Sequence, residues 1–161
     1  MLDAEILNEI IVRKILDNED IPYELLLDAD PSIEVISTYL GSSEIYIALL
    51  ENKIIGTFVL YPINQETLEI KNIAVDERLQ GRGIGKLLLR KATEIAEGKG
   101  AKKIDIATSN ASLGPLYLYQ KAGFDIDLIK KNFIIENYPE PLFDNGIQCR
   151  HMIVLTKYLP I

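Results

Sequence analysis

Residues 78–86 concentrate groups that could bind an anion. Gly81, Gly83 and Gly85 occupy alternate positions, and their missing side chains would let a ligand approach the backbone. The amide groups of this loop, together with the first N–H groups of a helix that follows it, would face a negative charge. The segment also carries Arg78, Arg82 and Lys86. We therefore expect a phosphate-bearing ligand at this loop.

Two common phosphate-binding motifs fail on spacing. In the P-loop pattern, Gly-Lys is followed by Ser or Thr, but here Leu87 follows Lys86 and Gln80 stands where an earlier glycine is required. A dinucleotide-binding loop needs a third glycine three residues after the second, in a parallel strand–helix–strand unit. Lys86 occupies that third position, and the strands before the loop are expected to be antiparallel. Both classes are disfavoured.

A strand and a helix must position this loop. Residues 67–75 are rich in β-forming residues and lead into it, and from Ile84 the apolar positions keep to one helical face until Gly98 and Gly100. Residues 44–50 and 53–61 are two earlier β-rich stretches joined by short polar connections, which is typical of hairpins. The pattern predicts an antiparallel meander, the loop and then a helix.

The rest of the chain supplies the flanking elements. Before the meander we expect a strand at 10–12 and helices at 17–27 and 31–40, and after the loop helix a strand at 104–106. Pro115 opens a further helix that ends at Gly123. Two closing strands are predicted at 124–129 and 149–158. The polar stretch between them, 130–148, is long enough to shape a binding site.

Composition indicates one folded domain covering residues 1–161, with 48% apolar residues and a net charge of −7. That charge disfavours binding to nucleic acid or to an anionic membrane, and no signal peptide or membrane-spanning run is evident. Cys149 has no second cysteine to pair with, and with His151 as the single histidine a Cys/His zinc site cannot form. We expect no metal and a reducing cytoplasmic setting, in which both residues pack rather than react.

The loop resembles that of the GNAT family of acetyltransferases, in which Gln or Arg, two residues, Gly, one residue and Gly or Ala stand at the mouth of a helix. Gln80, Gly83 and Gly85 match this pattern. The resemblance is firmest over residues 44–124 and implies that the loop binds the pyrophosphate of acetyl-coenzyme A (acetyl-CoA) and the preceding strand pairs with its pantetheine. The implied contacts are Ile73, Ala74, Val75, Gln80, Gly81, Arg82, Gly83, Ile84, Gly85, Lys86 and Asn110.

The same resemblance implies the catalytic groups. Glu69 stands eleven residues before Gln80, the interval of the general-base glutamate in the histone acetyltransferase branch, and such a base is needed because an ammonium cannot attack a thioester. Either Tyr119 or Tyr117 would protonate the departing thiolate. We favour Tyr119, because its interval to Gly123 lies within a helix whereas the interval from Asn110 to Tyr117 contains a loop that tolerates insertion.

From the resemblance we expect an α/β fold of GNAT type, with a mixed, mostly antiparallel sheet of about seven strands, flanked by helices and splayed between strands four and five. The implied activity is acetyl-CoA-dependent N-acetylation of a primary amine on a small molecule or peptide, by direct attack in a ternary complex. The alternative is a non-catalytic module that binds coenzyme A as a sensor or scaffold. The oligomeric state is open, and a homodimer is compatible with the family.

The C-terminal part is similar to a bacterial GNAT subgroup of unassigned substrate, some of whose members carry nominal labels as auxin or aminoglycoside acetyltransferases. His151 stands where that subgroup often has an acidic residue, so a role tied to that acid is in doubt here. We expect the acceptor side to be built by the two early helices, residues 130–148 and the last strands. Acidic residues there could attract a cationic amine: Asp125, Asp127, Glu136, Glu140 and Asp144.

Overall fold

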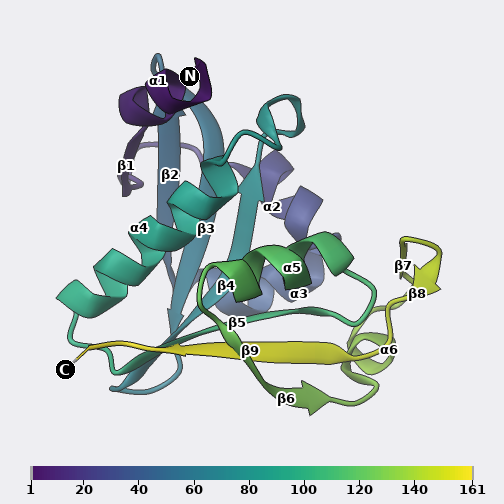
Figure 1. Cartoon of the computed structure of the whole chain (residues 1–161). Coiled ribbons are helices and arrows are strands. Elements are labelled where there is room, and N and C mark those ends of the chain that lie inside the picture. The colour runs from purple at the N-terminus through teal and green to yellow at the C-terminus, as the bar shows by residue number, and fades with distance from the viewer. Residues whose placement is uncertain (1, 161) are drawn as a thin grey trace.

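The computed structural model describes residues 2–160. They form a mixed sheet of seven strands with helices packed around it (Figure 1). Its spatial order is β1-β2-β3-β4-β5-β9-β6. Neighbouring strands are antiparallel except β4 and β5, which are parallel. The strands are β1 Ile11–Lys14, β2 Glu44–Leu50, β3 Lys53–Pro62, β4 Thr67–Val75, β5 Lys103–Ser109, β6 Asp125–Lys130 and β9 Met152–Tyr158. The predicted fold class is confirmed.

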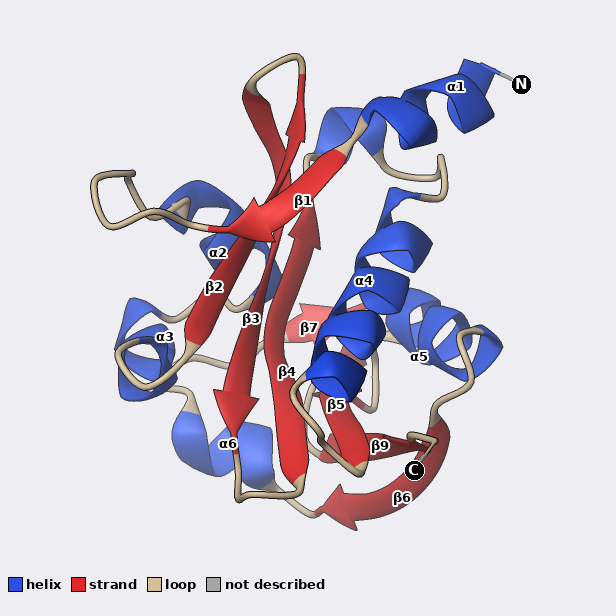
Figure 2. Ribbon diagram, turned by 90° about the vertical axis from the view of Figure 1, so that its left-hand side faces the viewer, coloured by secondary structure: helices blue, strands red, loops and turns tan. Residues whose placement is uncertain are grey.

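Helices cover both faces of this sheet, with α4 and α5 on one side and α2 and α3 on the other (Figure 2). The short strands β7 and β8 form a separate two-stranded ribbon near α6. These elements are α1 Leu2–Glu9, α2 Tyr23–Ala29, α3 Ile33–Leu40, the 3₁₀ helix η1 Glu77–Leu79, α4 Ile84–Gly98, α5 Leu113–Lys121, α6 Phe133–Asn137, β7 Phe143–Asp144 and β8 Ile147–Gln148.

The sheet separates two apolar cores. Phe58 and Leu60 of β3 pack with residues of α4 such as Leu88, whereas Val59 between them packs with α2 and α3, where Ile36 is fully buried. Because successive side chains of a strand point to opposite faces, a strand covered on both sides is apolar without alternation. This accounts for the continuous apolar run of β3.

β4 and β5 pair over only part of their length. The register runs from Thr67 opposite Lys103 to Ile70 opposite Ile106, but β4 continues to Val75 and β5 to Ser109. Beyond Ile70 the two strands diverge and leave backbone edges that do not pair with each other. The predicted splay between strands four and five is confirmed.

A β-bulge in β4 changes which face its side chains occupy. Leu60 lies opposite Ile70, but the next residue back along β3, Val59, lies opposite Asn72, so Lys71 is the extra residue. Ile70 therefore shares the α4 core with Leu60, while Asn72 faces α2 and α3 and donates to the Leu26 carbonyl (3.0 Å). The bulge brings polar side chains of β4 to the face covered by α2 and α3.

Several predicted boundaries were wrong, mainly at turns. The helix expected at 17–27 begins at Tyr23, because residues before Pro22 form a turn closed by the Arg13–Glu19 ion pair (2.7 Å). Helix α1 was not expected, and α6 with the β7–β8 ribbon lies inside the stretch expected to be irregular. Helix α5 begins two residues before Pro115, which is tolerated because the first helical N–H groups need no partner within the helix.

Candidate functional site

The glycine loop leaves several backbone donors free at the start of α4. Gly81 (φ 78°) and Gly83 (φ 87°) adopt left-handed conformations, which favour glycine. Gly83 is the N-cap of α4 and offers no side chain to cap it. The first helical bond runs from Leu87 N–H to the Gly83 carbonyl (3.1 Å). The amides of Ile84, Gly85 and Lys86 therefore have no partner within the helix and can face an anion.

Of the three basic residues near this loop, one is held by the protein itself. Arg78 forms a two-point contact with Asp76 (Nη2–Oδ2 2.7 Å, Nε–Oδ1 3.1 Å), and this guanidinium lowers the pKa of Asp76 to about 2. Arg82 is half-buried and Lys86 is exposed, and neither forms an ion pair within residues 2–160. Those two are the basic residues available to an incoming phosphate.

The end of β4 presents backbone groups to the gap left by β5. Asp76 N–H donates to the Ile55 carbonyl of β3 (2.8 Å). Because backbone groups alternate along a strand, those of Ala74 face β3, whereas those of Ile73 and Val75 face the gap. Gln80 of the loop already donates to the Val75 carbonyl (3.1 Å). An extended ligand carrying amides could add to this edge as a strand would.

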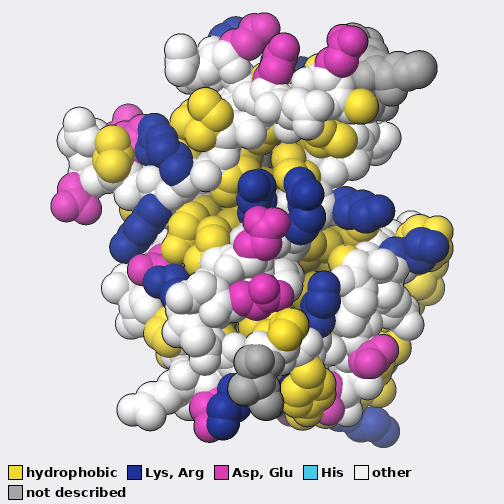
Figure 3. Space-filling model, turned by 60° about the vertical axis from the view of Figure 1, so that its left-hand side comes forward, with side chains coloured by type: hydrophobic (Ala, Val, Ile, Leu, Met, Phe, Trp, Pro, Cys, Tyr) yellow, Lys and Arg dark blue, Asp and Glu magenta, His cyan; other side chains and the backbone are white. Residues whose placement is uncertain are grey.

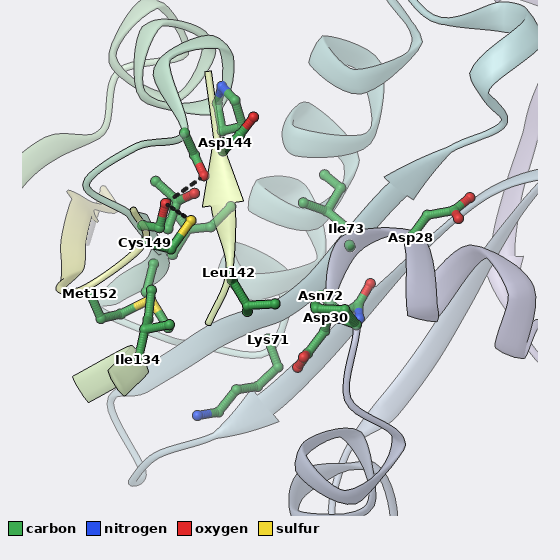
Figure 4. A pocket seen from close by; sticks show the side chains of 18 of the residues that line it. Asp28, Asp30, Lys71, Asn72, Ile73, Ile134, Leu142, Asp144, Cys149 and Met152 are labelled. Atoms are coloured by element: carbon green, nitrogen blue, oxygen red, sulfur yellow. Dashed lines mark hydrogen bonds between the residues drawn. The ribbon is translucent and has the colours of Figure 1, made fainter. Parts of the chain in front are cut away.

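The divergence of β4 and β5 opens into a cavity of about 600 Å³. Its walls come from β4, β5, α5, the α2–α3 connection and the C-terminal segment, and Figure 4 shows Asp28, Asp30 and Asn72 on one side with Leu142, Asp144 and Cys149 on the other. Ile73 and Tyr119 are the predicted site residues that line it. The loop 80–86 is not part of its lining and lies farther along β4.

The two candidate tyrosines lie in very different environments. Tyr119 lines the cavity with 7% of its surface exposed, whereas Tyr117 is 68% exposed. Residues two apart on a helix point to nearly opposite sides, so only one of them can face the sheet. Burial raises the pKa of Tyr119 to about 12, which keeps its hydroxyl protonated at neutral pH.

Glu69 is a half-buried carboxylate next to the bulge. Its Oε1 lies 3.4 Å from Lys71 Nζ, and its side chain is 15% exposed. Burial raises the pKa of Glu69, the Lys71 ammonium opposes that rise, and Asp105 adds to it from the neighbouring strand. Glu69 is not among the residues that line the cavity, but Lys71 is. The ion pair therefore links Glu69 to the cavity wall.

Asn110 holds the chain before β9 in place. Its Oδ1 accepts from the N–H groups of Arg150 (2.8 Å) and His151 (2.9 Å), and its Nδ2 donates to the Gln148 carbonyl (3.1 Å). The side chain thereby fixes the segment that carries Cys149, a residue of the cavity wall. This contact pattern is structural, and the implied contact of Asn110 with pantetheine stays a prediction.

Replacement of Asn110 by Ala should lower the free energy of unfolding by about 2 kcal/mol, because three hydrogen bonds are lost and two backbone N–H groups lose their acceptor. Urea unfolding followed by circular dichroism measures this loss. Asn137→Ala is the matched control, because exposed Asn137 makes one bond to the Phe133 carbonyl within α6. An equal effect of the two substitutions would contradict the proposed role of Asn110.

Asp30 and its partners were not anticipated from the sequence. The Asp30 carboxylate accepts from the Tyr138 hydroxyl (2.8 Å), the Tyr39 hydroxyl (3.3 Å) and the Ser32 N–H (3.4 Å). Burial raises the pKa of Asp30, although these donors oppose the rise. Tyr138 is 108 residues away along the chain, so no local pattern indicates the contact. The short segment rich in Asp before Pro31 was the available signal.

Cys149 and His151 have packing roles in the structure. Cys149 is buried and its Sγ lies 3.4 Å from the Ser109 hydroxyl, which donates to it. His151 Nδ1 accepts from the N–H of Asn132 (2.9 Å), a residue with φ 61°. No group of three or more potential metal ligands was found among the residues described.

Of the five acidic residues expected on the acceptor side, one lines the large cavity and four lie elsewhere. Asp144 lines the cavity. Asp125 and Asp127 lie on the exposed edge strand β6 and Glu136 on the outside of α6, while Glu140 lines a separate cavity of about 180 Å³. The expected electrostatic attraction therefore rests on Asp144 and on two acids not anticipated, Asp28 and Asp30.

The face of the molecule drawn in Figure 3 carries charges of both signs. Figure 3 shows acidic side chains interspersed with a band of basic ones over apolar surface. None of the helices in residues 2–160 combines the length and apolar character needed to cross a bilayer. The distinctive features of the molecule are thus the loop, the gap beside β4 and the cavity.

Comparison with known proteins matches residues 13–124 to the model of the acetyltransferase (GNAT) family. A protein of Bacillus subtilis strain 168 described as uncharacterized N-acetyltransferase YvbK is 45% identical over 139 residues, which cover 86% of this chain and 90% of that protein.

Two solved structures are similar over nearly the whole chain. A GNAT family acetyltransferase from Elizabethkingia anophelis with acetyl-CoA bound is 52% identical, with a TM-score of 0.93 over 94% of this chain and 99% of that one. A protein from Bacillus cereus described as an IAA acetyltransferase is 45% identical, with a TM-score of 0.89 over 93% and 99% of the two chains.

Proposed function

Because the chain belongs to the GNAT family of acetyltransferases, we propose that it transfers the acetyl group of acetyl-CoA to a primary amine of a small molecule or peptide by direct attack in a ternary complex. The observation that carries this proposal is the divergence of β4 and β5, which leaves a gap between the glycine loop at the start of α4 and a cavity lined by Tyr119. A cytoplasmic setting is part of the proposal and is supported by the buried, unpaired Cys149.

The donor side fits acetyl-CoA in shape and charge. The free amides at the start of α4, with Arg82 and Lys86 beside them, suit a pyrophosphate. The Ile73 and Val75 backbone groups that face the gap suit the amides of a pantetheine arm. Acetyl-CoA supplies a thioester carbonyl that is open to attack, and this arrangement would direct it into the cavity.

In the proposed reaction, Glu69 accepts a proton from the ammonium of the acceptor, directly or through a water molecule, which frees the nitrogen lone pair. A nitrogen–carbon bond then forms at the carbonyl as the carbon–sulfur bond breaks, and Tyr119 donates its hydroxyl proton to the departing sulfur. The acylated nitrogen, which still carries a positive charge, releases its second proton to solvent. The products are the N-acetyl amine and the free thiol of coenzyme A, and solvent exchange restores both side chains. The raised pKa of Glu69 suits it to accept a proton near neutral pH.

The test is release of coenzyme A thiol from acetyl-CoA in the presence of a panel of primary amines. Turnover that depends on the amine is expected. Stoichiometric binding of acetyl-CoA with no thiol release from any amine would favour the alternative, a sensor or scaffold that binds coenzyme A. The Glu69→Gln and Tyr119→Phe variants separate the two further, because neither should matter to a module that performs no chemistry.

Tyr119→Phe should lower kcat about tenfold with little change in the KM for acetyl-CoA. The effect is modest for an acid catalyst because a thiol of pKa about 8.5 leaves readily as the anion near neutral pH. Initial rates of thiol release at saturating acetyl-CoA measure the change. Tyr117→Phe is the matched control and should leave kcat within about twofold of the parent, because that side chain is exposed. The reverse ranking would assign the acid to Tyr117.

A further inference from the structure

Asp30 is a buried carboxylate whose direct partners are all neutral. It is 8% exposed, and it accepts hydrogen bonds from two phenol hydroxyls and one backbone N–H. Burial raises the pKa of Asp30 and the positive charge of Lys71 lowers it from a distance, but Lys71 Nζ lies 3.4 Å from Glu69 Oε1 and forms its ion pair there. Within residues 2–160 no Lys or Arg nitrogen lies within 4.0 Å of Asp30. Buried charges in proteins are usually paired with an opposite charge.

Asn72 adds an unpaired acceptor beside Asp30. The residue is 4% exposed, and its Nδ2 donates to the Leu26 carbonyl (3.0 Å) and the Tyr39 hydroxyl (3.2 Å). Its Oδ1 is the one buried side-chain nitrogen or oxygen of the described residues that lacks a hydrogen-bond partner. Figure 4 places Asn72 and Asp30 side by side in the cavity wall. This wall therefore holds a carboxylate without a direct ion-pair partner and an amide oxygen without a hydrogen-bond donor.

The rest of the cavity has the same bias in charge. Its lining contains three carboxylates, Asp28, Asp30 and Asp144, against the single ammonium of Lys71. Between these groups lie apolar side chains, including Ile106, Ile134 and Leu142, together with the hydroxyls of Thr108, Ser109 and Ser112. A ligand that fits would have an apolar body and positive charge.

The reacting amine cannot itself satisfy Asp30 throughout the reaction. To attack the thioester it must lose a proton and become neutral, which would leave the buried carboxylate without its counter-charge. A second ammonium that does not react would keep that charge paired. On the basis of the proposed function, we infer that Asp30, held by Tyr39 and Tyr138, binds a second ammonium group of the acceptor, so that the preferred substrates are diamines with an apolar spacer.

The inference is tested with amines that differ only in that second charge. We would compare octane-1,8-diamine with octylamine, and butane-1,4-diamine with butylamine, by initial rates of thiol release. For at least one pair we expect the parent protein to show a kcat/KM about tenfold or more higher for the diamine. In Asp30→Asn that ratio should fall to about 1, because the amide keeps the hydrogen-bond acceptor but not the charge. Equal kcat/KM for both members of every pair in the parent protein would overturn the inference.

Asp127→Asn is the matched control, since it removes one negative charge on exposed strand β6 and should leave the ratio unchanged. If Asp127→Asn lowers the ratio as much as Asp30→Asn does, the preference reflects overall charge and the inference fails. If Asp30→Asn does not fold, as judged by circular dichroism, the inference is tested on the parent protein by the salt dependence of its diamine preference. That preference should survive 0.5 M NaCl largely intact if the second ammonium is buried, and loss of the preference would indicate a surface effect.

Calorimetric titration with octane-1,8-diamine separates this inference from the proposed function. If no amine releases thiol but the parent binds the diamine about tenfold more tightly than Asp30→Asn does, the ammonium subsite stands and the acetyltransferase proposal fails. If monoamines and diamines are acetylated with equal kcat/KM, the proposed function stands and the subsite at Asp30 is rejected.

Discussion

Glu69→Gln is expected to lower kcat for acetyl transfer by about 10²- to 10⁴-fold, the usual contribution of a positioned general base. The amide keeps the size of the side chain but cannot take the proton of the acceptor ammonium. The KM for acetyl-CoA should stay within about twofold, because the side chain is assigned no contact with the donor. Thiol release at saturating amine and acetyl-CoA measures kcat.

The same substitution should stabilise the fold at neutral pH. Burial raises the pKa of Glu69 in the folded protein, so folding favours the protonated form and the ionised carboxylate costs stability above that pKa. Gln lacks the charge and avoids this cost. The melting temperature of Glu69→Gln should therefore exceed that of the parent protein at pH 7, and the two should converge below about pH 4.3, where the parent glutamate is protonated in both states.

Glu66→Gln is the matched control for both effects. Glu66 lies just before β4, is 62% exposed and pairs with Lys102 at 2.9 Å. Its replacement should change kcat by less than about twofold and leave the free energy of unfolding within about 0.5 kcal/mol. Retention of the parent kcat by Glu69→Gln would remove Glu69 from the mechanism, and a melting temperature below that of the parent at pH 7 would contradict the assignment of its pKa.

Gly83→Ala is expected to weaken acetyl-CoA binding about 5- to 30-fold, about 1–2 kcal/mol. The added methyl group causes no clash, since its nearest neighbour is Leu7 Cδ1 at 3.5 Å. The difficulty is the backbone, because φ is 87° and alanine there costs about 1–2 kcal/mol. Relaxation of that strain would turn the amides at the start of α4 away from the pyrophosphate. Isothermal titration calorimetry with acetyl-CoA measures the loss.

Gly100→Ala separates loss of the ligand from loss of stability. Gly100 follows the other end of α4, has φ 80° and has nothing within 4 Å of the added methyl group. Both substitutions should therefore lower the free energy of unfolding by a similar amount, about 1–2 kcal/mol. Only Gly83→Ala should alter the affinity for acetyl-CoA. If both weaken binding equally, the loop is not a specific site for the pyrophosphate.

The parts of the fold that local sequence determines were predicted closely. The predicted strands 44–50 and 67–75 match β2 and β4, because alternation and short polar turns act over a few residues. The start of α4 at Ile84 was also predicted, since glycines end one element and permit the next. The GNAT fold is confirmed, whereas the catalytic roles of Glu69 and Tyr119 stay predictions.

Long-range contacts account for what the sequence did not indicate. The Asp30–Tyr138 hydrogen bond joins segments that only the complete fold brings together. The bulge at Lys71 depends on pairing with β3, and nothing in the residues of β4 alone specifies it. Arg78 was expected to add charge for the ligand, but Asp76 holds it instead, because a nearby carboxylate competes with any incoming phosphate. The glycine loop could therefore be predicted in outline, whereas the cavity wall around Asp30 could not.

The position of β9 governs the order in which the molecule can assemble. This last strand lies between β5 and β6, so β6, although made earlier, has no neighbour to pair with until the C-terminal residues arrive. Synthesis proceeds from the N-terminus at about 5–20 residues per second. During this time the strands β2–β4 and helix α4 can associate, whereas the backbone groups of β6 remain unpaired. The nascent chain thus contains the glycine loop before the part of the cavity wall formed by residues 134–152 exists. Premature termination before β9 would leave an aggregation-prone strand edge rather than a smaller enzyme.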